Sequence, residues 1–155
     1  MPATPPGLRH LCRYEAFLDP AVQAFGITPF GRRTTVLITG GTVEGERLQG
    51  KLLPGGGDWA LVDTQGILHL DVRATFCMHD EALIHVTYQG LLHPYSRDLR
   101  QRIESGELSE EQVYFRTAPR FETSADRYTW LNGILAVAVG HLTASGVAYD
   151  VFEVM

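Results

Sequence analysis

Short runs of alternating hydrophobic and polar residues, separated by turns that contain glycine or proline, extend along most of the chain. This two-residue period places successive side chains on opposite faces of a strand, and many such runs are typical of a barrel or sandwich. The expected strands are Leu11–Leu18, Arg33–Thr39, Arg47–Leu53, Trp59–Asp63, Ile67–Cys77, Ala82–Gln89, Val113–Ala118, Tyr128–Val139 and Val147–Val154. The pattern predicts an all-β fold, and we expect a single antiparallel β-barrel.

Turn-forming residues between these runs predict three hairpin connections, at residues 63–66, 78–81 and 143–146. Each is rich in the residue types that favour tight turns, such as Asp, Ser and Gly. Much of the chain should therefore form a meander in which consecutive strands pair.

One segment has the spacing of a helix. Ser96 is a suitable N-cap, Leu99 and Ile103 lie four residues apart on one face, and Gly106 is a suitable end. We expect one short helix near Ser96–Gly106. A second turn is indicated at residues 109–112, where Ser and Gln have the spacing of a capping box.

Glycine-rich segments at residues 38–45 and 53–59 interrupt the strands and deliver Asp58 and Trp59 to the start of a new strand. A phosphate-binding loop needs a helix after its glycines, so that N-terminal amides point at the anion. The residues after Gly57 are strand-like instead. These segments favour a β cavity for a small molecule.

The strand Ile67–Cys77 has one apolar and one polar face. The apolar positions are Leu68, Leu70, Val72, Ala74 and Phe76, and the polar positions are His69, Asp71, Arg73 and Thr75. The hairpin loop decides their neighbours, since an even loop places Tyr88 beside Arg73, whereas an odd loop places His85 and Thr87 there. We expect Arg73 to point into the barrel, and Leu70, Val72 and Phe76 to face a helix or another subunit.

Length and composition restrict the class of protein. The 155 residues suit one domain, which we place at 11–155 after a disordered segment at 1–10. A formal net charge of −5 without a Lys/Arg run argues against nucleic acid or an anionic membrane as partner. No run approaches a membrane span, and the proline-rich Met1–Gly7 does not resemble a signal peptide. We expect a cytoplasmic protein.

Two carboxylates and two arginines are candidates for chemistry. Asp58 lies beside an aromatic residue, where loss of solvent would raise the carboxyl pKa and suit a general acid or base, or it only bonds the turn amides. Glu122 is the second acid, with an ion pair to Arg116 or Arg120 as its alternative. Arg73 and Arg116, if inward, would stabilise negative charge on a ligand or belong to an internal ion-pair network.

Aromatic and amide side chains are candidates for ligand contacts. Tyr128, Trp130 and Asn132 would share one face of a strand, as a ring-binding surface or as core. The further candidates are Trp59, His69 and Tyr88. The histidines show neither a His-x-His pair nor a helical HExxH motif, and only His69, Asp71 and His85 could meet across one hairpin. We expect no metal and no cofactor.

Five ordered motifs resemble the family known as domain of unknown function 3237. They are residues 38–45, Leu52–Trp59, Leu70–Arg73, Tyr114–Thr123 and Tyr128–Asn132. The resemblance covers about Leu11 to Val154 and implies a single-domain barrel of calycin-like or allene-oxide-cyclase-like build, usually cytoplasmic and oligomeric. Two positions depart from the pattern: Ala74 replaces a common aromatic residue, and Glu81 replaces a glycine at the hairpin.

The leading hypothesis is a cofactor-independent isomerase, cyclase or lyase that acts on a small hydrophobic or aromatic carbonyl compound. Asp58 or Glu122 would move a proton, Arg73 or Arg116 would stabilise enolate charge, and aromatic residues would hold the ring. The alternatives are a non-catalytic ligand carrier and a structural module with a filled barrel. We also expect a homodimer or higher homo-oligomer, because the apolar faces of Ile67–Cys77 and of Ile134–Val139 need cover.

Overall fold

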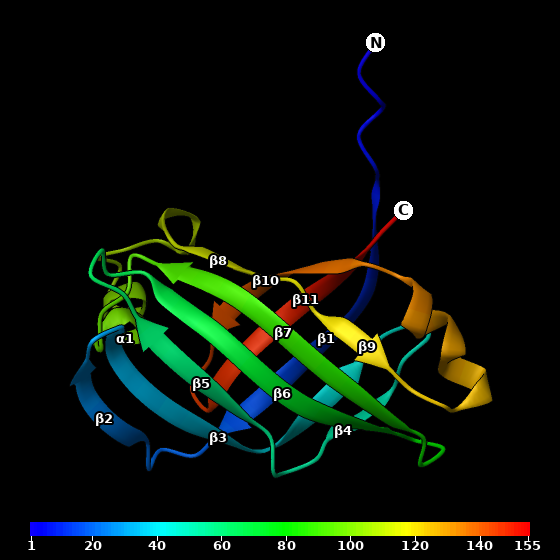
Figure 1. Ribbon diagram of the computed structural model, residues 1–155, viewed down its shortest axis with the longest axis horizontal. Helices are drawn as coiled ribbons and strands as arrows, with labels where there is room; N and C mark the ends of the chain where they lie inside the picture. Colours follow the sequence, from blue (N-terminus) through cyan, green and yellow to red (C-terminus); the bar gives the residue numbers. More distant parts are fainter.

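The computed structural model describes residues 1–155, and its core is a closed antiparallel barrel of eight strands (Figure 1). Neighbouring strands around the barrel are β1, β3, β5, β6, β7, β8, β10 and β11, and β6–β7 pairing closes the ring. The strands are β1 (Leu8–Leu18), β2 (Gln23–Thr28), β3 (Gly31–Glu44), β4 (Gly50–Leu52), β5 (Gly57–Val62), β6 (Leu68–Met78), β7 (Leu83–His93), β8 (Tyr114–Thr117), β9 (Arg120–Glu122), β10 (Ala136–Leu142) and β11 (Gly146–Val154). None of the helices is long or apolar enough to traverse a lipid bilayer.

The predicted antiparallel barrel and its hairpins are confirmed. The three expected turns connect β5 to β6, β6 to β7 and β10 to β11, and each hairpin pairs antiparallel. β1 begins at Leu8, where it pairs with Val154, so it is longer than expected. The short strands β2 and β9 were not expected; β2 pairs with β3 outside the closed ring, and β9 continues the sheet beside β7.

The prediction for the two faces of β6 was wrong. Leu70, Val72 and Phe76 are 5%, 3% and 0% exposed and belong to the core, whereas the side chain of Arg73 is 57% exposed. In a barrel of eight strands the interior is just wide enough to be filled by side chains, and burying an unpaired guanidinium there would cost several kcal/mol. The apolar face therefore points inward.

The segment Tyr128–Val139, which was expected to form one strand, is divided into two elements. Residues Asp126–Gly133 form the 3₁₀ helix η2, and β10 begins only at Ala136. The side-chain amide of Asn132 accepts a hydrogen bond from the Thr123 amide at 2.8 Å and donates one to the Thr123 carbonyl at 2.9 Å. These local bonds fold the segment back on itself and override the strand propensity of its aromatic residues.

The expected helix is present at one end of the barrel, as α1 (Leu99–Glu104). Leu99 is buried and Ile103 packs against the core, so this face covers the barrel end as predicted. The N-cap is Asp98 rather than Ser96, whose hydroxyl donates to the Asp98 carboxylate at 2.7 Å. The predicted capping box forms at the 3₁₀ helix η1 (Glu110–Gln112), which follows α1.

The strand β3, which contains the glycine pair at residues 40 and 41, pairs with different strands along its length. Residues 31–37 of β3 pair with β2 and β5, whereas its later residues pair with β1 and β4. A Cβ atom at Gly41 would lie 2.0 Å from the carbonyl oxygen of Glu15, so only glycine permits this close approach of β1. The glycine-rich segment thus shapes the barrel wall, as the sequence indicated.

Candidate functional site

A cavity of about 160 Å³ lies inside the barrel. Fifteen of its seventeen lining residues are hydrophobic, and they come from most strands of the ring and from Tyr95, just before α1. The cavity lies towards the barrel end where β1 and β10 finish, at Leu18 and Leu142. A concave, mostly apolar space with few polar groups is the usual form of a small-molecule site.

Asp58 is the one carboxylate in the cavity wall. It is the second residue of β5, where strand alternation turns it and Ala60 inward. Its Cα partners are Val36 on β3 and Val72 on β6, and Val72 is in turn opposite Tyr88 on β7. The register therefore places a carboxylate and a phenol in one row across the cavity wall.

Burial raises the pKa of Asp58 to about 6. The main-chain amide of Asp71 donates a hydrogen bond to Oδ1 at 2.9 Å, which lowers the pKa in part, and the nearby Asp71 carboxylate raises it. No protein group donates a hydrogen bond to Oδ2. Asp58 therefore has one oxygen held by the backbone, one oxygen free for a ligand, and a pKa suited to proton transfer near neutral pH.

A cluster of tyrosines lies next to Asp58. The ring centroids of Tyr88 and Tyr149 are 5.3 Å apart, that of Tyr14 lies 4.9 Å from Tyr149, and Phe115 packs edge-on against Tyr149 at 5.4 Å. Tyr88 and Tyr149 line the cavity. Burial raises the pKa of Tyr88 to about 12 and raises the pKa of Tyr149 well above its ordinary value, so both phenols keep their protons at neutral pH.

Trp59 lies on the other side of the barrel wall from Asp58. Neighbouring residues of a strand face opposite sides, so Trp59 lines a hollow of about 780 Å³ on the outer surface, together with His69 and Arg116. The predicted aromatic wall beside Asp58 is therefore built by Tyr88 and Tyr149 instead. Three of the predicted ligand-binding residues meet, but outside the barrel and apart from Asp58.

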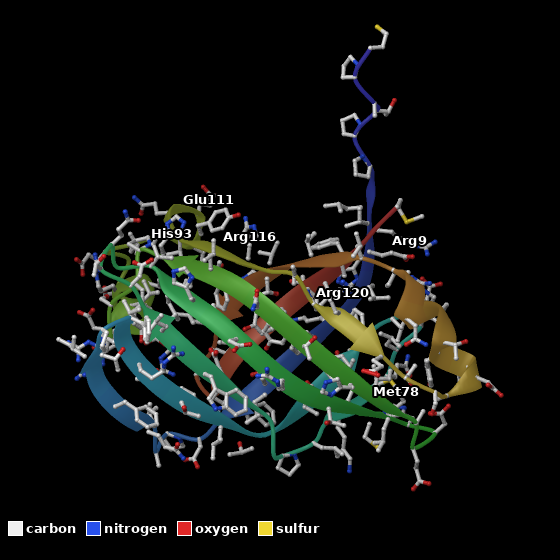
Figure 2. All side chains as sticks on the ribbon, in the orientation of Figure 1. Arg9, Met78, His93, Glu111, Arg116 and Arg120 are labelled. Carbon is white, nitrogen blue, oxygen red and sulfur yellow. The ribbon has the colours of Figure 1, made fainter.

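The other predicted charged residues also lie on the outer wall. Arg73 contacts Asp71 at 3.7 Å and lies over the Trp59 ring. Arg73 is opposite Thr87, as expected for a β6–β7 loop with an odd number of residues. Glu122 on β9 is exposed and opposite His85. Arg116 is labelled at the top of Figure 2, where its side chain projects away from the barrel. The proposed partnership of Arg73, Arg116 and Glu122 with Asp58 does not form.

The three predicted residues of η2 have separate local contacts. The hydroxyl of buried Tyr128 donates to Asp80 in the β6–β7 turn at 3.3 Å, and the guanidinium of Arg47 lies 4.2 Å above the Trp130 ring. Asn132 binds the backbone as described above. None of the three lines the cavity, and the Tyr128 contact attaches η2 to the β6–β7 turn.

Tyr149, Tyr95 and Phe115 line the cavity but were absent from the predicted site. Alternation in Val147–Val154 puts Tyr149 on the same face as Val147 and Val151, which is a core pattern, so the sequence held a signal that it faces inward. No comparable signal brings Tyr95 to the cavity, because its position depends on how the chain leaves β7 and enters α1.

The comparisons with known proteins agree with this fold. The family model for "Protein of unknown function (DUF3237)" matches residues 6–154. A UPF0311 protein of Rhodopseudomonas palustris strain TIE-1 is 34% identical over 136 residues, which cover 86% of this chain and 88% of that protein. A beta-barrel like protein of Acinetobacter baumannii AYE superposes with a TM-score of 0.85 at 31% identity, covering 99% of both chains.

A structure of an enzyme from Penicillium herquei superposes with a TM-score of 0.76 at 18% identity, covering 100% of this chain and 98% of that chain. At this identity the likeness concerns the fold alone. The family model and the R. palustris relative both extend over most of the chain. The chain belongs to the DUF3237 family of proteins of unknown function.

Proposed function

We propose that the barrel cavity binds a small hydrophobic or aromatic carbonyl compound and that Asp58 transfers a proton to or from it without a cofactor. The reaction class is isomerisation, cyclisation or elimination. One observation carries the proposal: the single carboxylate in the wall of an apolar cavity has a pKa of about 6 and an oxygen without a protein partner. Glu122, Arg73 and Arg116 have no part in this proposal, because they lie on the outer wall.

The local geometry supports distinct roles for the polar groups. Above pH 6 Asp58 is mostly ionised, so Oδ2 can accept a proton from carbon next to the ligand carbonyl and later return it at another position. The phenol of Tyr88 stays protonated and can donate a hydrogen bond to the enolate oxygen that forms, while Tyr149 hydrogen-bonds Tyr88. These reactions involve no net oxidation or reduction, so no redox partner is required.

The size of the cavity limits the ligand. Protein cavities of about 150 Å³ accommodate a molecule of the size of benzene. The cavity here, at about 160 Å³, therefore fits a single ring or a short branched chain with one carbonyl group. The apolar lining excludes ligands with several charges.

The fold is compatible with catalysis. The Penicillium herquei protein with this fold is an enzyme. Because one fold hosts many functions, this likeness raises the expectation of chemistry in the barrel but says nothing of the substrate.

The first experiment is native mass spectrometry of the purified protein, followed by denaturing extraction of any retained metabolite. Compounds of that class are then assayed with the parent chain, Asp58→Asn and Glu122→Gln. We expect Asp58→Asn to bind the ligand within a few-fold and to lower kcat by about 10² to 10⁴, the usual contribution of a positioned acid or base. Glu122→Gln, which removes an outer carboxylate, should turn over at the parental rate.

The result also separates catalysis from transport. If the parent chain binds the ligand and returns it unchanged, in deuterated solvent as in ordinary water, the protein is a carrier. An unchanged kcat in Asp58→Asn would exclude Asp58 as the proton-transfer group.

A further inference from the structure

The strand β2 is an open edge outside the closed barrel. It pairs with residues 31–35 of β3 on one side and with no strand on the other. Figure 1 shows it as the outermost blue strand, at the same end of the molecule as α1. An unpaired edge leaves backbone N–H and C=O groups available to another chain.

The side chains around this edge are large, apolar and exposed. Phe25, Ile27 and Phe30 are 62%, 78% and 75% exposed, and Val22 is 46% exposed. No residue of β2 is buried, so neither face of the strand is covered by this chain. Contiguous exposed apolar residues of this kind mark an interaction site.

The segment also lacks the features that normally protect an edge strand. Natural proteins place charged residues on open edges, which prevents pairing with another chain. Residues 20–31 of this sequence, PAVQAFGITPFG, contain no Asp, Glu, Lys or Arg, although 20% of the chain is charged. A neutral edge is suited to pairing.

We propose that β2 is the contact with a second copy of this chain, in which the two β2 strands pair antiparallel about a two-fold axis. A two-fold contact brings together the same surface of both copies, so a charged residue in it would lie near the same charge on the second copy. The neutral segment meets this requirement, whereas a partner with a charged surface would find no complement in it. The result is a homodimer with one sheet continued across both barrels.

The available area is sufficient for a stable contact. A buried aromatic side chain covers about 150–250 Å², so the exposed parts of Val22, Phe25, Ile27 and Phe30 amount to roughly 500 Å² per copy. Two copies therefore present about 1,000 Å² of apolar side-chain surface at this edge, which is of the order of the usual lower limit for a specific interface. The exposed flanking residues Pro20, Ala21 and Pro29 enlarge the surface further.

This surface differs from the two that the sequence indicated. Ala136 and Ala138, like the apolar residues of β6, are buried inside the barrel and need no partner. On that segment Leu135 is 58% exposed, close to the value for Phe25, and lies away from β2. Leu135→Lys is therefore a matched control for a charge placed on β2.

The test measures mass by sedimentation equilibrium for the parent chain, Ile27→Lys and Leu135→Lys, with circular dichroism to verify folding. We expect a dimeric parent, a dimeric Leu135→Lys, and an Ile27→Lys variant whose dimer dissociation constant rises about 10²-fold or more, because charge at the centre of an apolar contact removes a major binding residue. A parent chain that stays monomeric at high concentration would overturn the proposal. So would an oligomer that Ile27→Lys leaves intact.

Amide hydrogen exchange of the parent chain provides a test that needs no variant. Dilution should accelerate exchange in residues 23–28 and leave the barrel strand β11 unchanged, because only the dimer protects the outer edge of β2. Exchange in β2 that is independent of concentration, in a chain of dimeric mass, would place the contact elsewhere and refute this assignment.

Discussion

At the scale of single residues, burial of Asp58 affects both the stability of the fold and the proposed chemistry. The barrel places this carboxyl in an apolar wall, and the resulting pKa of about 6 differs from its ordinary value of 3.8. A folded-state pKa above the unfolded one means that the folded chain holds more protons between about pH 4 and pH 6. The free energy of unfolding therefore falls as pH rises through that window, and the ionised Asp58 carboxylate destabilises the fold at neutral pH.

We expect Asp58→Asn to be more stable than the parent at pH 8. Each pKa unit corresponds to about 1.4 kcal/mol, so removing the buried charge should raise the free energy of unfolding by about 1–3 kcal/mol. The gain should disappear below about pH 4, where the parent carboxyl is protonated in both states. Urea unfolding at pH 8 and pH 4 measures the difference.

Asp63→Asn provides a comparison of opposite sign. A hydrogen bond from His69 lowers the pKa of the half-buried Asp63 carboxyl, so its ionised form stabilises the fold and this stabilisation is lost as pH falls. The amide variant should be less stable than the parent near neutral pH. A stability gain in Asp63→Asn, or none in Asp58→Asn, would contradict this account of the two carboxyls.

At the scale of elements, most of the strands were predictable, but the inward face of β6 was not. Alternation located β6 and its hairpin, because a two-residue period is a local property of the sequence. The inward face depends on closure of the whole barrel, which brings Leu70 and Phe76 against other strands. η2 was missed because the bonds between Asn132 and Thr123 join residues nine apart. β2 was missed because Gly26 interrupts its pattern and prolines at positions 20 and 29 flank it.

The β6–β7 hairpin contains a departure from the family pattern that the structure makes testable. Glu81 has a φ of +70°, a conformation that costs roughly 1–2 kcal/mol for residues other than glycine. Glycine at this position would lose more entropy on folding, by about 0.5–1 kcal/mol. We expect Glu81→Gly to stabilise the protein by about 0.5–1 kcal/mol in urea unfolding.

Glu81→Ala separates backbone strain from charge in this test. It removes the carboxylate but keeps a Cβ atom at positive φ, so it should give none of the gain. Equal stabilisation by both variants would assign the effect to the charge of Glu81, and the backbone explanation would fail.

At the scale of the whole molecule, closure of the barrel divides the predicted site into an inner and an outer part. Asp58 and Trp59 are adjacent in sequence, yet one faces the cavity and the other faces the outer hollow. The order of the motifs along the chain gave no indication of this separation, because the side chains of adjacent residues in a strand face opposite sides of the barrel wall. The inner part retains the cavity and the carboxyl with the raised pKa, among buried core residues. The cavity is therefore a local exception to packing, which should reduce stability where it permits binding.

Filling the cavity should raise stability and abolish binding. Ala60 is buried beside Asp58 on the inner face of β5 and lines the cavity, so Ala60→Leu adds three carbons to open space. Each buried CH₂ contributes about 0.8 kcal/mol, and we expect a gain of about 1–2 kcal/mol after some loss to repacking. Ala138→Leu is the control, because Ala138 is fully buried away from the cavity and should lose about 1–3 kcal/mol by overpacking. Thermal unfolding and titration with the retained ligand measure both quantities. If Ala60→Leu binds that ligand as the parent does, the ligand does not occupy the barrel interior, and the outer hollow lined by Trp59, His69 and Arg116 becomes the site to test.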